Sequence, residues 1–247
     1  MRLFGLIGYP LTHSFSKNYF TTKFEEQGIR DCAYENFQIE NIADLPRIIH
    51  DHPALAGLNV TIPHKESVLP FLHASNDLVQ QINACNCITI TNKQLFGYNT
   101  DVIGFERSLL NKLGGQHTHA LILGTGGAAK AVEFVLEKRH IEFKKVSRRP
   151  SKNSFGYEQV TADIVKEYKL IINTTPVGMF PAVHEFPPLP YDAITPEHFL
   201  FDLIYNPEET LFLKKGKEQR AVTQNGYDML VYQAEESWRI WNQEILT

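Results

Sequence analysis

Short apolar runs alternate along the chain with segments that have the pattern of helices. Arg2–Gly8 and Leu55–Ile62 are apolar runs of strand length, and a turn containing proline follows each of them. The segment from about Ser16 to Gln27 is predicted to be a helix that Gly28 ends. Because strand and helix signals alternate from one end of the chain to the other, the pattern predicts βα units and largely parallel sheets.

The rest of the amino-terminal part continues this alternation. Its further strands are expected at Cys32–Ile39, Ala84–Ile90 and Gln94–Tyr98. Asn41 can cap the next helix, where Pro46 is tolerated close to the first turn. A helix should begin near His64, and another is expected over Ser75–Ile82.

A helix from Asp101 to about Leu113 is expected to link this part to a second half of the same kind. The strands predicted in the second half are His119–Leu123, Phe143–Ser147, Leu170–Thr174, Phe199–Leu203 and Ala221–Thr223. The last helix, Tyr227–Trp241, carries one apolar stripe at helical spacing, formed by Leu230, Val231, Ala234, Trp238 and Trp241. The pattern therefore predicts an α/β protein with two domains.

The overall composition excludes several classes of protein. The 247 residues are 43% hydrophobic and 21% charged, which is ordinary for a globular chain. A formal net charge of -4 without a run of Lys or Arg argues against nucleic acid binding. No apolar stretch approaches the roughly 20 residues that span a bilayer, and no signal peptide is recognised. Cys85 and Cys87 are too close for a disulfide, so we expect reduced thiols, a cytoplasmic location and no metal site.

A glycine-rich turn marks a candidate cofactor site. Gly124-Thr125-Gly126-Gly127-Ala128-Ala129 fits G-x-G-x-x-A between a predicted strand and a predicted helix. In that context glycine lets the backbone approach a pyrophosphate, and the helix amino terminus supplies N–H donors. Ser147-Arg148-Arg149 stands at the end of the next strand, where an NAD site would carry an acidic residue. Guanidinium groups bind a 2′-phosphate instead, which favours NADP.

Polar residues gather at predicted strand ends in the first half. Ser14 and Ser16 stand where a loop enters a helix, and their hydroxyls suit a substrate carboxylate, although either serine could simply cap the helix. Lys65 follows a strand at its carboxyl end, where open α/β sheets bind ligands, although a single lysine there could be a surface residue. Asn86 and Asp101 add an amide and a carboxylate, and Asp101 could also be a helix cap.

Taken together, these motifs resemble those of shikimate dehydrogenases and occur in the same order. The motifs are H-S-x-S, N-V-T-x-P-x-K, A-x-N, N-T-D, the glycine-rich turn, N-x-T-P-x-G-M, D-x-x-Y-x-P-x-x-T and M-L-V-x-Q-A, and they cover nearly the whole chain. The resemblance implies a substrate-binding domain at residues 1–101, joined by the last helix at about 226–247. It implies a Rossmann-type NADP-binding domain at 102–225, with a cleft between the two.

The resemblance also implies an activity and the residues that perform it. The reaction would be the reversible NADPH-dependent reduction of 3-dehydroshikimate to shikimate by a monomer or homodimer, with Lys65 and Asp101 as the catalytic residues. The residues that would bind the substrate are Ser14, Ser16, Thr61, Lys65, Asn86, Asp101, Tyr205 and Gln233. The residues that would bind the cofactor are Gly124, Thr125, Gly126, Gly127, Ala128, Ser147, Arg148, Arg149, Ile204 and Gly226.

Three other functions are compatible with parts of this pattern. A quinate/shikimate dehydrogenase would use NAD, and the Arg148-Arg149 pair without an acidic residue argues against it. A methylene-tetrahydrofolate dehydrogenase has a similar plan, but H-S-x-S and the Asn86 and Asp101 set fit it poorly. A regulator that binds NADP or shikimate without catalysis would need neither Lys65 nor Asp101 for proton transfer.

Overall fold

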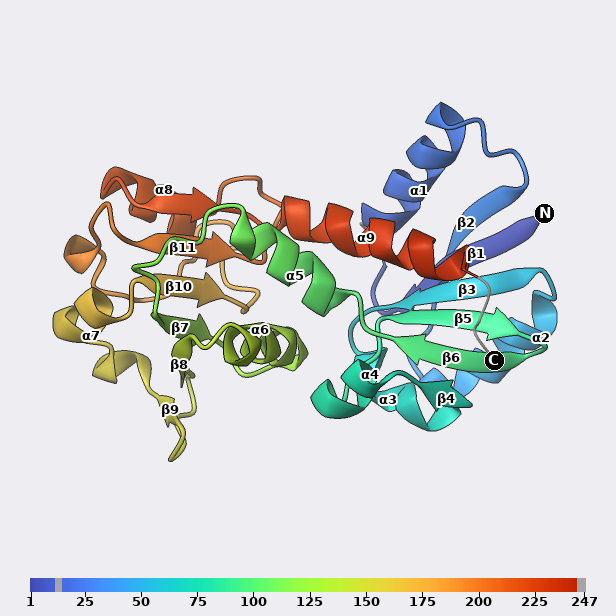
Figure 1. Ribbon diagram of the computed structural model, residues 1–247, viewed down its shortest axis with the longest axis horizontal. Helices are drawn as coiled ribbons and strands as arrows, with labels where there is room; N and C mark the ends of the chain where they lie inside the picture. Colours follow the sequence, from blue (N-terminus) through green and yellow to red (C-terminus); the bar gives the residue numbers. More distant parts are fainter. Residues whose placement is uncertain (12–14, 244–247) are drawn as a thin grey trace. The chain divides into compact units, whose positions relative to one another are not determined.

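A computed structural model describes residues 1–11 and 15–243 and divides into two compact units (Figure 1). Unit 1 contains the chain up to Thr100 and again from Gln233, and unit 2 contains Asp101–Tyr232. Each unit has its own six-stranded sheet. None of the helices in the described part of the chain combines the length and the apolar character needed to cross a membrane.

The sheet of unit 1 has the strand order β2-β1-β3-β5-β6-β4. These strands are β1 (Arg2–Gly8), β2 (Cys32–Gln38), β3 (Leu55–Val60), β4 (Ala74–Ser75), β5 (Cys87–Thr91) and β6 (Gln94–Tyr98). Within the described residues β5 alone runs against its neighbours, because a two-residue turn joins it to β6. Asn92 and Lys93 in this turn have φ values of 52° and 64°, as a type I′ hairpin requires.

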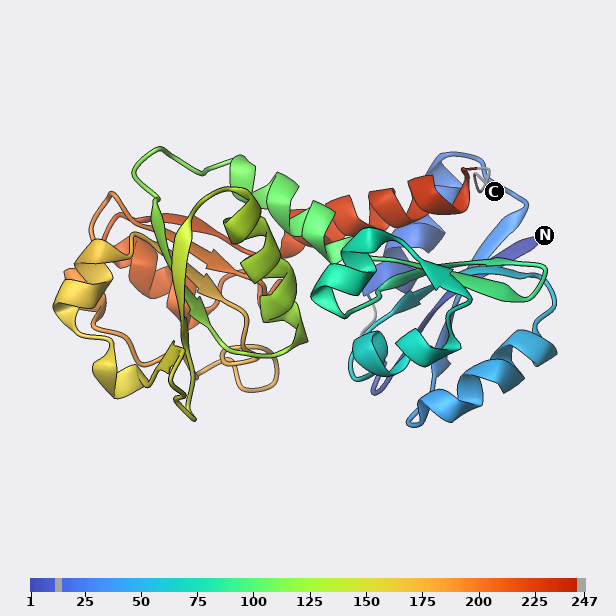
Figure 2. The same cartoon turned by 60° about the horizontal axis from the view of Figure 1, so that its bottom comes forward.

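Helices cover both faces of this sheet, as Figure 2 shows. On one face α1 (Phe15–Glu26) and the second part of α9 (Tyr227–Trp241) pack Phe20 and Trp241 against Phe4. On the other face lie the three shorter helices α2 (Leu45–Asp51), α3 (His64–Ser67) and α4 (Asp77–Ile82). The predicted Ser75–Ile82 helix begins later, because Asn76 accepts from the Val79 N–H as its cap and Ser75 belongs to β4.

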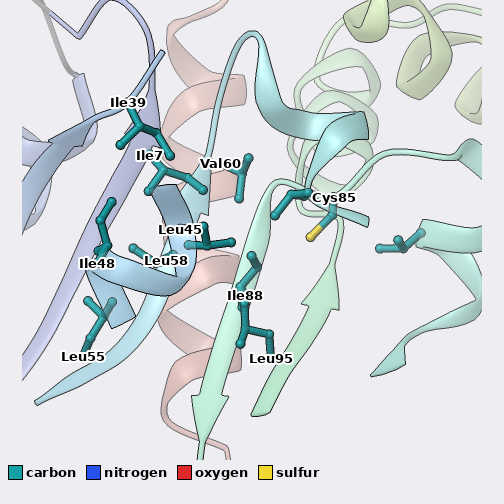
Figure 3. Packing of buried hydrophobic residues seen from close by; sticks show 12 residues of the cluster. Ile7, Ile39, Leu45, Ile48, Leu55, Leu58, Val60, Cys85, Ile88 and Leu95 are labelled. Atoms are coloured by element: carbon teal, nitrogen blue, oxygen red, sulfur yellow. The ribbon is translucent and has the colours of Figure 1, made fainter. Parts of the chain in front are cut away.

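The second face of unit 1 is a continuous apolar core (Figure 3). Leu45 of α2 lies among Leu58 of β3 and Ile88 of β5, and each of these side chains is 0% exposed. This core anchors the carboxyl end of β3, from which the predicted Thr61 and Lys65 follow. The apolar core therefore fixes the position of the strand end at which the predicted polar residues lie.

The sheet of unit 2 is parallel throughout its six strands, in the order β12-β11-β10-β7-β8-β9. The strands are β7 (His119–Leu123), β8 (Glu142–Val146), β9 (Ser154–Phe155), β10 (Leu170–Asn173), β11 (Phe199–Asp202) and β12 (Val222–Gln224). The chain builds β8 and β9 on one side of β7 and then returns to build β10 on the other. Such a switch point is where open parallel sheets bind ligands, at the carboxyl ends of the strands.

Two pairs of helices enclose the sheet of unit 2. In Figure 2, α6 (Gly127–Lys138) and α7 (Ala162–Glu167) lie on opposite sides of the strands. The α5 helix (Asp101–Leu110) accompanies α6, and α8 (Leu211–Glu218) accompanies α7. The sequence pattern did not predict α7 or α8. Both are short, and their signals are the caps Thr161 and Thr210, each of which accepts from the backbone N–H three positions further along.

Candidate active site

The segment after β3 carries Thr61 and, in the short helix α3, Lys65. It is tied to the sheet because the Thr61 N–H donates to Ile7 O at 2.9 Å, and the His64 N–H donates to Thr61 O at 2.9 Å. Lys65 lies half-buried in the short helix α3. Its carbonyl accepts from the Cys85 N–H at 2.8 Å, which joins the turn to the segment that contains Asn86.

His64 anchors this turn to the backbone of Ile39 and was not predicted as part of the site. Its imidazole is 3% exposed, and Nε2 lies 2.8 Å from Ile39 O. Because a carbonyl only accepts, Nε2 carries the proton, and Nδ1 can then accept from the Ser67 hydroxyl at 3.4 Å. The buried histidine therefore fixes the backbone that presents its neighbour Lys65.

Asn86 and Gln233, two predicted substrate ligands, are hydrogen-bonded to each other in unit 1. Its Nδ2 donates to Gln233 Oε1 at 3.2 Å and to Thr100 Oγ1 at 3.0 Å, and its Oδ1 accepts from the Thr100 N–H at 2.6 Å. Asn86 is only 3% exposed. The structure therefore brings together Asn86, directly before β5, and Gln233 of α9, which are far apart in the sequence.

Ser16 lies in the first turn of α1, and Ser14 lies outside the described residues. Burial raises the pKa of Tyr34 well above its usual range, and a hydrogen bond with Ser16 acts in the opposite direction, which places the two hydroxyls together. The α1 helix is held against α9 because Lys23 Nζ pairs with Glu235 at 2.7 Å. Ser16 and Gln233 are therefore carried by two helices that contact each other within unit 1.

Asp101 and Tyr205 belong to unit 2. Asp101 is the first residue of α5 and is 7% exposed. It directly follows Thr100, whose backbone is fixed by Asn86. Tyr205 is half-buried, and burial raises the pKa of its hydroxyl. The pairing of Lys65 with Asp101 stays a prediction.

The glycine-rich turn occupies the gap between β7 and α6. Gly124 has φ +112°, and a Cβ there would meet Thr174 Oγ1 at 2.6 Å, so glycine is required. Gly126 is the N-cap of α6 and makes no side-chain cap, while positions 125–127 are exposed. A Cβ at Gly126 or Gly127 would meet nothing within 4 Å. The helix amino terminus therefore offers uncapped N–H donors beside open space, which fits a pyrophosphate.

Arg148 and Arg149 are exposed directly after β8. The Ser147 hydroxyl accepts from the Arg149 N–H at 3.2 Å, and the Ser147 N–H donates to Phe155 O at 2.9 Å, so the turn has a defined backbone. The positive charge of Arg148 opposes the burial that raises the pKa of Tyr157. This strand end therefore offers hydrogen-bond donors and positive charge, the chemistry that a 2′-phosphate needs.

Ile204 and Gly226 meet in unit 2, because the Gly226 N–H donates to Ile204 O at 3.0 Å. A Cβ at Gly226 would overlap the backbone of Leu203, so only glycine allows this approach. Asp202, which is 0% exposed, is the last residue of β11 and directly precedes the loop that carries Ile204. Sequence reasoning named the motif of Asp202 but gave the residue no role.

Asp202 organises the ends of β10 and β11 through neutral partners. It accepts from Thr210 Oγ1 at 2.6 Å, from Asn173 Nδ2 at 3.0 Å and from the Ile204 N–H at 3.1 Å. Asn173 in turn accepts from the Thr175 N–H at 3.0 Å. Burial nevertheless raises the pKa of Asp202 to about 7, against the lowering effect of these hydrogen bonds.

In the described part of the chain, no three His, Cys, Asp or Glu side chains converge on a possible metal position.

Comparisons with known proteins find similar sequences along almost the entire chain. Residues 6–88 match the family described as the shikimate dehydrogenase substrate binding domain. A protein from Methanococcus maripaludis strain C6, named shikimate dehydrogenase (NADP(+)), is 38% identical in an alignment 257 positions long, which covers 97% of this chain and 91% of the relative.

Two solved structures have a similar fold. The shikimate dehydrogenase of Aquifex aeolicus has a TM-score of 0.87 and 31% identity, covering 98% of this chain and 92% of that one. The shikimate 5-dehydrogenase of Thermus thermophilus, in complex with NADP(H) and shikimate, has a TM-score of 0.86 and 30% identity, covering 98% and 94%. The similarity in sequence and in structure extends across both units.

Proposed function

This chain belongs to the shikimate dehydrogenase family, and we propose that it catalyses the reversible NADPH-dependent reduction of 3-dehydroshikimate to shikimate, a step in chorismate and aromatic amino acid biosynthesis. One observation carries the proposal beyond family membership. Asn86 donates a hydrogen bond to Gln233 Oε1 at 3.2 Å, and the Cys85 N–H next to it donates to the Lys65 carbonyl at 2.8 Å. Three polar residues from separate elements thus converge in unit 1.

In this proposal unit 1 binds the substrate. Ser14 and Ser16 hold the carboxylate near the start of α1, where hydroxyl donors favour an anion. Thr61, Lys65, Asn86 and Gln233, together with Asp101, bind the ring hydroxyls. Tyr205 lies close to the substrate carboxylate in this proposal. The tied loop after β3 and the buried Asn86 support these roles because a bound polyol needs ligands with fixed positions.

Lys65 is the proton donor in the direction of reduction. Its ammonium group donates a proton to the C3 oxygen as that oxygen gains negative charge, and its positive charge stabilises the alkoxide beforehand. In the oxidation of shikimate, the neutral amine accepts the hydroxyl proton. Asp101 is the acidic partner that orients Lys65 and accepts a hydrogen bond from the substrate.

Unit 2 binds NADP in this proposal. When bound, NADPH supplies the hydride. The turn from Gly124 to Ala128 binds the pyrophosphate at the start of α6, while Ser147, Arg148 and Arg149 bind the 2′-phosphate. Ile204 and Gly226 line the nicotinamide position. The uncapped α6 amino terminus and the exposed basic turn after β8 support this assignment.

Two alternatives remain distinguishable by their chemistry. A quinate/shikimate dehydrogenase using NAD would not need Arg148 and Arg149, and a regulator without catalysis would not need Lys65. We further propose a cytoplasmic enzyme, a monomer or homodimer, with no nucleic acid partner, in keeping with the net charge of -4.

The deciding experiment follows the absorbance of the reduced nicotinamide with shikimate or quinate and with NADP or NAD. We expect turnover with shikimate and NADP, and much lower kcat/KM for the other three combinations. Turnover with quinate and NAD would favour the first alternative. Binding of both ligands by calorimetry without turnover would favour the regulator.

A further inference from the structure

A hydrogen-bonded network of four further side chains lies behind Asn86 and Gln233 in unit 1. The Tyr34 hydroxyl donates to Asn59 Oδ1 at 2.8 Å, and Asn59 Nδ2 donates to Ser237 Oγ at 2.9 Å. The Ser237 hydroxyl lies 3.3 Å from the Thr100 hydroxyl. The network therefore runs from β2 through β3 to α9 and ends on the two predicted substrate ligands.

Burial makes each link of this network consequential. Ser237 and Thr100 are 0% exposed, and Tyr34 is 3% exposed. A buried polar group that loses its partner retains its desolvation cost, so such networks favour one arrangement of donors and acceptors. The backbone groups in the network define that arrangement, because an N–H only donates and a carbonyl only accepts.

The orientation of the Asn59 amide follows from a backbone carbonyl. Its Nδ2 lies 3.3 Å from Asn86 O, an acceptor, so the NH2 group must face Asn86 and Ser237. Its Oδ1 must then face Tyr34, which donates its single proton there. The Ser237 hydroxyl accepts from Asn59 and donates its own proton to Gln233 O at 2.9 Å, one turn earlier in α9.

The orientation of the Asn86 amide follows from a backbone N–H. The Thr100 N–H donates to Asn86 Oδ1 at 2.6 Å, so the NH2 group of Asn86 faces Thr100 Oγ1 and Gln233 Oε1. Gln233 Oε1 must therefore accept from Asn86. The NH2 group of Gln233 is left to face away from this bond, as a donor toward a ligand oxygen.

We propose that Ser237, Asn59 and Thr100 are positioning residues that fix the Asn86 and Gln233 amides, so that Gln233 presents N–H donors to a hydroxyl oxygen of the substrate. This inference rests on the proposed function, because the ligand oxygen is taken to belong to shikimate. Ser237 acts on the backbone of Gln233, and Thr100 acts on the side chain of Asn86. Neither needs to touch the substrate.

The test is a double-mutant cycle between Ser237 and Gln233. Ser237→Ala should raise KM for shikimate by about 3- to 10-fold, the range expected for the loss of one hydrogen bond, with kcat and KM for NADP nearly unchanged. Gln233→Ala should raise KM for shikimate further. In the Gln233→Ala background, Ser237→Ala should add almost nothing, because Ser237 acts through Gln233.

A matched control separates positioning from a general loss of stability. Ser108 is also 0% exposed, and its hydroxyl accepts from the amide of Gln224 at 2.6 Å in unit 2. Ser108→Ala should lower the melting temperature in the manner of Ser237→Ala and leave KM for shikimate unchanged. Equal KM values for shikimate in Ser108→Ala and Ser237→Ala would overturn the proposal. Additive effects of Ser237→Ala and Gln233→Ala on this KM would also overturn it.

Thr100 provides a second route if Ser237→Ala does not fold. Thr100→Val keeps the volume and removes the hydroxyl, whereas Thr100→Ser keeps the hydroxyl. KM for shikimate should rise in Thr100→Val and return close to the wild-type value in Thr100→Ser. A rise in both variants would mean that packing alone matters and would overturn the proposal. Failure of the wild-type protein to turn over or bind shikimate would reject the proposed function instead, because the cycle would have no wild-type value.

Discussion

His64 and Lys65 are neighbours in one helical turn with opposite environments. The His64 imidazole is 3% exposed and hydrogen-bonded to Ile39 O, whereas the Lys65 side chain is half-buried. The buried histidine anchors the turn, and the lysine is the residue for which we propose a role in proton transfer. At this scale the motif identified Lys65, but only the contacts identify why its backbone is fixed.

Replacing Lys65 tests the proton transfer. Lys65→Met keeps most of the side-chain volume and removes the charge, so the fold should persist. We expect kcat to fall by about 10² to 10⁴, as for other positioned proton donors, while shikimate binding suffers less because Asn86 and Gln233 remain. Steady-state kinetics with both ligands saturating measure this. A folded variant within a few-fold of the wild-type kcat would reject the role.

Asp202 allows a prediction about stability and pH. Its pKa is raised by burial from 3.8 to about 7 in the folded protein, so folding favours the protonated form between these values. The stabilisation that comes from protonated Asp202 is therefore fully present below about pH 4 and is lost as the pH rises to about 7. The free energy of unfolding should fall over this range by up to about 4 kcal/mol from this group alone.

Asp202→Asn removes this titration and keeps the partners. The new amide can accept from the Ile204 N–H and donate to the Thr210 hydroxyl. Urea unfolding from about pH 5 to 8 should show the wild type losing stability relative to the variant up to about pH 7, and no further change above it. Asp163→Asn, at a side chain that is 92% exposed, is the control and should follow the wild-type curve. Parallel curves for wild type and Asp202→Asn would contradict the raised pKa.

Two neighbouring elements of unit 2 divide the proposed anion binding between them. The amino terminus of α6 supplies backbone N–H groups, and the end of β8 supplies the side chains of Arg148 and Arg149. Backbone donors serve any dinucleotide, whereas the guanidinium groups serve only one that carries a 2′-phosphate. In this proposal, the preference for NADP over NAD depends on the residues at the end of β8.

Removing the basic pair should separate the two nucleotides. In Arg148→Ala/Arg149→Ala, the binding free energy of NADP should become less favourable by roughly 1.5–3 kcal/mol for each charged hydrogen bond lost, while that of NAD barely changes. Calorimetry with each nucleotide measures both values. Lys144→Ala, an exposed charge within β8, controls for general electrostatics and should have little effect. Equal losses for NADP and NAD would exclude 2′-phosphate recognition by this pair.

The molecule as a whole consists of two units with separate sheets and separate cores. The chain passes between them at Thr100 and Asp101, and again within α9 at Tyr232 and Gln233. Unit 1 is therefore completed only when the last part of the chain joins it. The predicted substrate ligand Gln233 lies at this second crossing.

Hydrogen exchange should resolve the two proposed ligand sites. NADP alone should slow amide exchange in unit 2 around Gly124–Ala129, and shikimate alone should slow it in unit 1 around Thr61–Lys65 and Asn86. The reason is that a bound ligand stabilises the local backbone that contacts it. Protection of only one unit by both ligands would contradict the division of roles.

The sequence by itself determined the α/β class and most strand positions, and it predicted which residues form the candidate sites. Apolar runs of strand length were sufficient for β1, β3 and β7, because strands that are covered on both faces are apolar nearly throughout. Short elements such as α7, α8 and β9 escaped the pattern, because one or two turns of helix or a two-residue strand carry too few positions to show a period.

Only the tertiary structure decided which distant side chains meet. Nothing local indicates that Tyr34, Asn59 and Ser237 form one network, or that Asp202 is buried with neutral partners. Hydrogen bonds between residues far apart in the sequence depend on strand order and helix placement, and propensity and spacing do not encode these. Motifs therefore predict which residues take part in the proposed chemistry, whereas the residues proposed to position them are recognised only in the folded chain.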